Sequence, residues 1–312
     1  MQAKVQDPAI RKPSAPNRGT SGPSSLYRSE IWRIGLSMVK VLPPSVCARL
    51  GRALAWLYWA IAKRRREVVI QNLLPALAED PERAKQTARA LFQQLALKVI
   101  DLWRYEAGLP IENLFGESTG WEHFVAAQNQ KRGVLLLTPH LGNWEFGAPW
   151  LARSGVALQV ITMAEPTQDF TKLRQKSRAR WNIETLVIGE DPFAFLEVIK
   201  RLEAGATVAL LIDRPPAATA VQVQLFGRPF AASVAAAELA RASGCVLLPV
   251  FLPRANTAYA AHVLPAIAYD RPTLRERSAR QELTQKIMSV FEPVILQYLD
   301  QWYHFVPIWP DS

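Results

Sequence analysis

One stretch, residues 133–150 (GVLLLTPHLGNWEFGAPW), constrains more than any other what this chain can fold into. Residues 134–137 are apolar, show no helical period and are bounded by a glycine and a proline, which predicts a buried strand of a parallel sheet. A Gly-Asn pair then indicates a turn, and residues 144–152 fit a helix. The stretch therefore predicts a strand, a tight corner and a helix, as in an α/β fold.

Two side chains at this corner suggest chemistry. His140 directly follows the predicted strand, and Glu145 lies in the first turn of the predicted helix. Ligands of open α/β sheets bind beyond the carboxyl ends of the strands. A neutral imidazole there can accept a proton from a hydroxyl group, and a nearby carboxylate can orient the ring and stabilise the imidazolium. We therefore expect His140 to act as a general base and Glu145 to orient it. The alternative is a structural histidine beside a solvated glutamate.

The rest of the chain alternates in the same way. Asp213 and Arg214 directly follow an apolar run, just as His140 does. We therefore expect Asp213, Arg214 and His140 to lie at the same crevice beyond the ends of the strands. Alternating strands and helices predict an α/β fold with a mainly parallel sheet flanked by helices. The expected strands are residues 156–161, 185–188, 208–212, 221–226 and 246–252, and the expected helices are 82–106, 170–181, 193–203, 233–243 and 286–303.

Composition narrows the class of protein. The net charge of +10 suits a nucleic acid, an anionic membrane surface or an acidic protein partner. No nucleic-acid-binding signature accompanies it, so we expect a membrane partner and no nucleic acid. The four histidines lack zinc-site spacing, which predicts no metal. Cys47 and Cys245 lie in apolar segments, which is typical of an intracellular protein without disulfides.

The amino-terminal part predicts attachment to a membrane. Residues 1–28 are basic and rich in proline and glycine, so we expect a disordered arm. Residues 29–66 are apolar and aromatic but are interrupted by Arg49 and Arg52, short of the ~20 apolar residues that a bilayer span requires. We expect interfacial helices anchored by the basic run 63–66, which favours the cytoplasmic side. The alternative is a pair of ordinary buried helices. Residues 67–312 would then form the catalytic domain.

A serine hydrolase is a rival interpretation. Residues 116–120 (GESTG) match the nucleophile-elbow pattern G-x-S-x-G. No apolar strand precedes them, however, and Thr119 with Glu122 fits a capping box for a helix over residues 121–129. We therefore disfavour Ser118 as a nucleophile.

The string His-Leu-Gly-Asn-Trp-Glu resembles the H-x4-(D/E) signature of the glycerolipid and lipid A acyltransferases. Over about residues 42–302 the chain looks most like the bacterial lipid A biosynthesis acyltransferase family, the late enzymes of the lauroyl or myristoyl type. This resemblance implies that His140 and Glu145 are the catalytic pair. It places Arg178 where the family has an arginine that contacts the phosphate region of the acceptor, and Asp213 at the family's later acidic residue.

Other positions follow or depart from the family pattern. Gly227, Arg228 and Pro229 resemble its F-G-x-P turn, which is implied to bind substrate, although a plain β-turn is the alternative. Gln301-Trp302 resembles its terminal Gln-Trp, but the residues that follow differ. The family usually has Gln or His after the residue that Asp213 matches, whereas this chain has Arg214 and two prolines, which leaves the acceptor or the acyl chain length open. Together Arg178 and Arg214 suggest a phosphorylated acceptor.

The activity implied is transfer of a fatty acyl chain from acyl-acyl carrier protein, an acidic partner, to a hydroxyl of a lipid A or related saccharolipid precursor. No cofactor is expected, and the expected location is the cytoplasmic face of the cell inner membrane. One alternative is an acyltransferase for another phospholipid or glycolipid acceptor. Another is a non-catalytic protein that binds anionic lipid.

Overall fold

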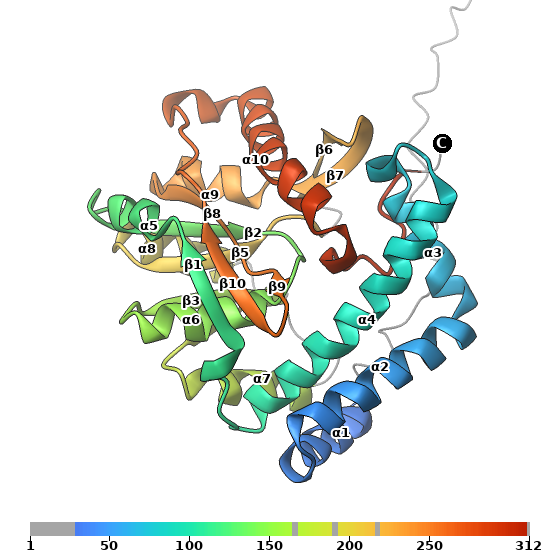
Figure 1. Cartoon of the computed structure of the whole chain (residues 1–312). Coiled ribbons are helices and arrows are strands. Elements are labelled where there is room, and N and C mark those ends of the chain that lie inside the picture. The colour runs from blue at the N-terminus through green and yellow to red at the C-terminus, as the bar shows by residue number, and fades with distance from the viewer. Residues whose placement is uncertain (1–28, 164–167, 189–192, 216–218, 311–312) are drawn as a thin grey trace, which may run out of the picture.

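The computed structural model of this chain describes residues 29–163, 168–188, 193–215 and 219–310 (Figure 1). The predicted disordered arm, residues 1–28, lies outside the described residues. The prediction of an α/β fold with a mainly parallel sheet flanked by helices is confirmed.

The sheet has eight strands, and β2 (Val134–Thr138) lies near its centre. The strand order is β1-β10-β8-β2-β5-β3-β4, with β9 paired to β10, and the pairs that involve β10 with β8 or β9 are antiparallel. Because β5 and β8 flank β2 in parallel, the carboxyl ends of all three strands meet at one edge. The other strands are β1 (Phe115–Thr119), β3 (Leu158–Met163), β4 (Glu184–Ile188), β5 (Thr207–Leu211), β8 (Val246–Phe251), β9 (Arg254–Ala255) and β10 (Ala258–Val263).

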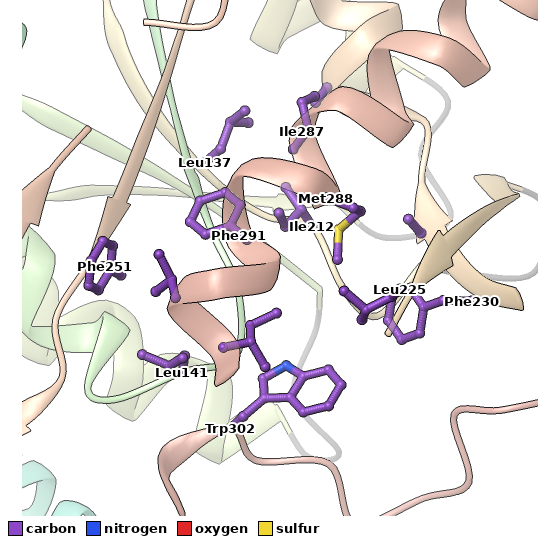
Figure 2. Packing of buried hydrophobic residues seen from close by; sticks show 14 of the residues in the cluster. Leu137, Leu141, Ile212, Leu225, Phe230, Phe251, Ile287, Met288, Phe291 and Trp302 are labelled. Carbon is purple, nitrogen blue, oxygen red and sulfur yellow. The ribbon is translucent and has the colours of Figure 1, made fainter. Parts of the chain in front are cut away.

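Helices cover both faces of the sheet. Side chains alternate along a strand, so Leu135 and Leu137 of β2 face one layer and Val134 and Leu136 face the other. The first layer contains α8 (Phe193–Glu203), α9 (Ala235–Ser243) and α10 (Arg277–Gln297); Figure 2 shows Ile287, Met288 and Phe291 of α10 packed near Leu137. The second layer contains α5 (Trp121–Gln128) and α6 (Gly147–Arg153).

The corner after β2 differs in detail from the prediction. The expected helix over residues 144–152 begins as a short 3-10 turn, η4 (Trp144–Phe146), and continues as α6. Gly142 has a φ of +60°, and a Cβ there would lie 2.0 Å from the backbone oxygen of Leu252. Only glycine fits a left-handed position with so close a backbone neighbour.

The segment GESTG also differs from its prediction. Residues Phe115–Thr119 form the strand β1, and the residue that precedes α5 is Gly120, which makes no side-chain cap. The expected capping box at Thr119 is therefore wrong, because the Thr119 hydroxyl instead lies 2.8 Å from Nδ1 of His262.

The amino-terminal helices pack against one long helix. Figure 1 shows α4 (Pro81–Glu106) between the sheet and α2 (Pro44–Ile61), with α1 (Ser29–Val41) beside them and α3 (Lys63–Leu73) following. Trp32 of α1 is fully buried and makes edge contacts with Trp103 of α4 and with Phe170 of α7 (Gln168–Ala179). In the described part of the chain, no helix combines the length and the apolar character that crossing a membrane requires.

The carboxyl-terminal segment returns to the corner after β2. Following η7 (Leu299–Gln301), the backbone N–H of Tyr303 donates to the carbonyl of His140 at 2.9 Å. Asn72 of α3 holds this segment, because its side-chain amide donates to the carbonyls of His304 and Val306 at 3.0 and 2.8 Å. The last residues of the chain therefore help to build the site at the centre of the sheet.

Candidate active site

His140 lies just beyond β2, and its partner is Asp213, just beyond β5. The Nδ1 atom of His140 is 2.6 Å from Oδ1 of Asp213, and the backbone N–H of His140 donates to the same carboxylate at 2.9 and 3.1 Å. The two residues meet because β2 and β5 are neighbours in register, so their ends coincide. Sequence reasoning expected both residues in one crevice, and the structure confirms that they meet there.

Asp213 is completely buried and accepts hydrogen bonds from several donors. Besides His140, Nε1 of Trp302 donates at 3.0 Å and Nε2 of His304 lies at 2.9 Å. Nε of Arg214 lies 3.5 Å from the remaining ring nitrogen of His304. This network assigns the Nδ1–H tautomer to His140, which leaves Nε2 free to accept a proton.

The surroundings keep the imidazole neutral and the carboxylate ionised. Burial and the positive charge of Arg214 lower the pKa of His140 to about 4, although Asp213 acts in the opposite direction. Burial alone would raise the pKa of Asp213, but its contacts with His140 and His304 hold that pKa well below the usual range. At neutral pH the pair is therefore a neutral base held by a carboxylate, the arrangement that general-base chemistry requires.

The other carboxylate of the predicted pair is engaged elsewhere. Glu145 receives Nε and Nη2 of Arg178 at 2.9 to 3.2 Å, and Nη1 of Arg174 lies 3.3 Å away. Burial opposes ionisation of Glu145, but Arg178 and Arg174 outweigh it and lower its pKa to about 2. This placement corrects the expectation that Glu145 orients the His140 ring, because Asp213 occupies that position.

The residues that were predicted to bind substrate differ in their burial and in their ion pairs. Arg178 is buried and committed to Glu145, whereas Arg214 is exposed beside His304. Arg228 forms an ion pair with Glu79 at 2.8 Å. Gly227 has a φ of +70° in the tight turn that joins β6 (Ala220–Leu225) to β7 (Arg228–Ser233), and Pro229 follows in β7. Substrate binding by these residues stays a prediction.

That hairpin supports the site indirectly. Phe226 and Phe230 lie against the ring of Trp302, which donates to Asp213. The resemblance to the F-G-x-P turn thus marks a segment that packs behind the carboxylate. Figure 2 shows Phe230 and Leu225 of this hairpin on the same side of the core as Trp302.

An apolar cavity lies between the sheet and α6. Thr138, Trp144 and Glu145 line it at the edge of the sheet where His140 lies, and Trp144 also contacts the His140 ring at 5.0 Å between centroids. Deeper residues come from five neighbouring strands, among them Leu136, Val160, Ala209, Val250 and Val263. The candidate base therefore lies beside an apolar cavity whose lining comes from five neighbouring strands.

Sequence reasoning missed several residues of the site. No sequence pattern marks His304, because its contact with Asp213 depends on the path of the last residues in three dimensions. Lys98 was not singled out, although it shares a helical stripe with Leu91, Leu95 and Leu102, where a lysine at an apolar position is a readable signal. Among the described residues, no cluster of His, Cys, Asp or Glu has the arrangement of a metal site.

The positive charge of Arg214 is one cause of the low pKa of His140. Arg214→Met removes the cation that opposes protonation of His140, so the pKa of His140 should rise from about 4 towards its ordinary value. NMR titration of isotope-labelled histidine side chains measures this directly. Arg228→Met, which removes an arginine paired with Glu79, is the matched control and should leave the titration unchanged. A His140 pKa that stays the same or falls in Arg214→Met contradicts this electrostatic account.

Comparison with known proteins identifies the family of this chain. The sequence model of the family described as "Bacterial lipid A biosynthesis acyltransferase" matches residues 25–310. The chain is 28% identical over 192 residues to phosphatidylinositol mannoside acyltransferase of Mycobacterium tuberculosis (strain CDC 1551 / Oshkosh), covering 61% of this chain and 58% of the relative. It is 24% identical over 190 residues to the protein of the same name from Mycolicibacterium smegmatis (strain ATCC 700084 / mc(2)155), covering 60% of each. The match thus spans about three-fifths of these relatives. Since the family model covers nearly the whole chain, this protein belongs to the bacterial lipid A biosynthesis acyltransferase family.

Proposed function

We propose that this acyltransferase moves a fatty acyl chain from a thioester donor to a hydroxyl group of a glycolipid at a membrane surface. The observation that carries the proposal is the His140–Asp213 pair beside an apolar cavity. A neutral imidazole held by a carboxylate suits direct transfer between two substrates, because it can accept the proton of the attacking hydroxyl.

His140 and Asp213 would carry out the proton transfers of the acyl transfer. Nε2 of His140 takes the proton of the acceptor hydroxyl while that oxygen attacks the thioester carbonyl carbon, whose C=O pair moves onto oxygen. Collapse of the tetrahedral intermediate breaks the C–S bond, and the departing thiolate takes the proton from the imidazolium. Asp213 stabilises the imidazolium in between, and general-base assistance of this kind contributes about 10² to 10⁴ in rate.

The cavity is suited to the acyl chain. Its lining comes from β10, β8, β2, β5 and β3, which are consecutive in the sheet. Four interstrand spacings correspond to roughly 19 Å, a length that accommodates a long fatty acyl chain. Burying such a chain contributes about 0.8 kcal/mol per CH₂ group, so the cavity would hold the donor chiefly by its hydrocarbon part.

The acceptor follows from the relatives and from the exposed cation. The named relatives are acyltransferases of phosphatidylinositol mannoside, a phosphorylated glycolipid. We infer an acceptor of that kind, with a lipid A precursor as the second candidate. Arg214 is the predicted phosphate ligand that remains exposed at the crevice, whereas Arg178 already neutralises Glu145.

The donor and its delivery remain part of the proposal. An acyl-acyl carrier protein is an acidic protein, and the net charge of +10 would favour its approach. The chemistry above needs no cofactor, because the thioester is already activated and the base belongs to the chain. We place the reaction at the cytoplasmic face of the inner membrane, where such a donor and a lipid acceptor would meet.

The exposed face of α2 supports attachment to a membrane. Leu50, Leu54, Leu57 and Ile61 recur at helical spacing, and between 42 and 68% of each side chain is exposed. Trp56 of α2 and Ile34 and Val41 of α1 are also exposed, and the cations of residues 63–66 follow α2 in the chain. An apolar helical stripe beside a basic cluster is typical of a helix that lies in the interface of an anionic membrane.

A transfer assay tests the function and the role of the cavity together. The purified protein is incubated with palmitoyl-acyl carrier protein and either phosphatidylinositol mannoside or a phosphorylated lipid A precursor, and the products are identified by mass spectrometry. We expect palmitate on the glycolipid and none with His140→Ala. Ala209→Leu should lower kcat/KM for the palmitoyl donor roughly tenfold relative to a shorter donor, because overfilling a packed site costs about 1–3 kcal/mol.

The matched control is Ala204→Leu, which adds the same atoms at an exposed position just before β5. Absence of glycolipid product with either acceptor, despite a folded protein, rejects the proposed function. An unchanged chain-length preference in Ala209→Leu rejects this cavity as the acyl site.

Attachment to a membrane is tested by flotation with vesicles that contain phosphatidylglycerol. The double variant Leu54→Gln/Leu57→Gln should bind at least tenfold more weakly, because each leucine contributes about 1.5–3 kcal/mol when it is buried in lipid. Leu196→Gln/Leu296→Gln alters leucines that are 50 and 49% exposed on α8 and α10, and should bind like the unaltered protein. Equal binding by both double variants would exclude α2 as the docking face.

A further inference from the structure

Lys98 occupies a core position that the proposed mechanism has not used. It lies on the apolar stripe of α4, and only 5% of it is exposed. Leu91 and Leu102 on the same stripe are buried, so the helix turns Lys98 into the protein rather than towards solvent. A lysine at such a position is rare unless its charge is paired or has a function.

The ammonium group of Lys98 contacts two aromatic rings. Its Nζ lies 2.7 Å from the centroid of the Trp144 ring and 4.7 Å from that of Tyr303. Within the part of the chain that the structure describes, this ammonium makes no hydrogen bond or ion pair. Cation–π contacts at a desolvated site offset only part of the free energy that burying an ion costs. The lysine therefore destabilises the fold unless an anion arrives to pair with it.

Both rings belong to the immediate surroundings of His140. The Trp144 ring lies 5.0 Å from the His140 ring, and the N–H of Tyr303 donates to the His140 carbonyl. Trp144 also lines the apolar cavity at its edge near the base. The unpaired ammonium is thus next to the place where a thioester carbonyl would lie with its acyl chain in the cavity.

The neighbouring charges do not neutralise Lys98. Glu145 is the carboxylate that most favours its charged form, but Arg178 and Arg174 already bind Glu145. Arg174 and Arg214 act against the charge of Lys98, and burial, the largest effect, holds its pKa well below the usual range. A negative charge that develops near Trp144 would meet a cation that forms no ion pair with any residue the structure describes.

We propose that Lys98 is a catalytic residue whose ammonium stabilises the oxyanion formed on the thioester carbonyl during acyl transfer. This proposal rests on the acyltransferase function proposed above. When the acceptor oxygen attacks, the C=O electron pair becomes a charge on oxygen, and Lys98 stabilises that charge while His140 holds the acceptor proton. When the intermediate collapses, the electron pair on oxygen re-forms the C=O bond, and the C–S bonding pair leaves with the sulfur.

The burial of Lys98 favours an oxyanion over a phosphate group of the acceptor. A phosphate carries its own hydration and would have to enter a space that two aromatic rings cover. The oxyanion needs no entry, because it appears on a carbonyl that is already bound. A preorganised cation in a site without water stabilises the transition state strongly, because the site does not have to reorganise when the oxyanion forms.

The test uses Lys98→Met and Lys98→Arg in the full chain, with Lys85→Met as the control. Lys85 lies on the same helix with 59% of its side chain exposed and is paired only with Glu82. The reactions are transfer from palmitoyl-acyl carrier protein to phosphatidylinositol mannoside and, without an acceptor, release of palmitate by water, which passes through the same oxyanion. We expect Lys98→Met to lower kcat about 10² to 10³-fold in both reactions. The KM values should stay within about threefold.

Two further readouts separate catalysis from structure. The melting temperature of Lys98→Met should equal or exceed that of the unaltered protein, because an apolar side chain of similar size replaces an unpaired buried charge. The kcat of the unaltered protein should fall as the pH rises through the pKa of Lys98, which burial holds well below the usual range. Lys98→Arg should regain part of the lost turnover and keep it to higher pH, because an arginine stays protonated.

Three results would overturn the proposal. A rise in KM for phosphatidylinositol mannoside with an unchanged rate of palmitate release would assign Lys98 to the acceptor phosphate. A loss of kcat and melting temperature together in both Lys98 variants would assign it a structural role. A kcat in Lys98→Met within threefold of the unaltered protein would exclude any catalytic role. Failure of the unaltered protein to transfer or release palmitate would instead reject the proposed function itself.

Discussion

The buried carboxylate of Asp213 is the interaction on which the rest of this site depends. It accepts hydrogen bonds from the ring and the backbone of His140, from Trp302 and from His304, and none of its surface is exposed. An ionised carboxylate buried in this way is stable only because these donors compensate the loss of water. Removing any one donor would therefore affect both the fold and the protonation of His140.

Three distant parts of the chain must meet for these bonds to form. The neighbouring strands β2 and β5 bring the ends that carry His140 and Asp213 together, and the last residues deliver Trp302 and His304. Asn72 fixes that last segment from α3, a helix far away in the sequence. This explains why residues with no chemical role of their own, such as Gly142 and Asn72, are tightly constrained around the site.

Much of the fold could be predicted from local pattern. The apolar run 134–137 and the alternation that follows it predicted a parallel sheet and its flanking helices. The meeting of His140 and Asp213 was also predictable, because each follows a parallel strand. Which carboxylate holds the ring was not, since spacing along the chain favours Glu145 and the order of strands favours Asp213.

The charged contacts at the site could not be predicted from local sequence patterns, for a physical reason. The family resemblance predicted that Arg178 contacts the acceptor, whereas Arg178 forms an ion pair with Glu145. Lys98 was hidden within an amphipathic helix, where one lysine among leucines changes the average pattern little. A buried ion pair depends on the packing of separate elements in three dimensions, whereas hydropathy depends only on neighbours along one element.

The turnover of Asp213→Asn tests the central claim most directly. The asparagine keeps the shape of the side chain but removes the charge that fixes the Nδ1–H tautomer and stabilises the imidazolium. We predict that kcat for acyl transfer falls by about 10⁴, as expected when a catalytic histidine loses its carboxylate partner. The protein should retain the circular dichroism of the folded state. A folded Asp213→Asn variant with kcat within tenfold of the unaltered protein would contradict the assignment of Asp213 as the partner of His140.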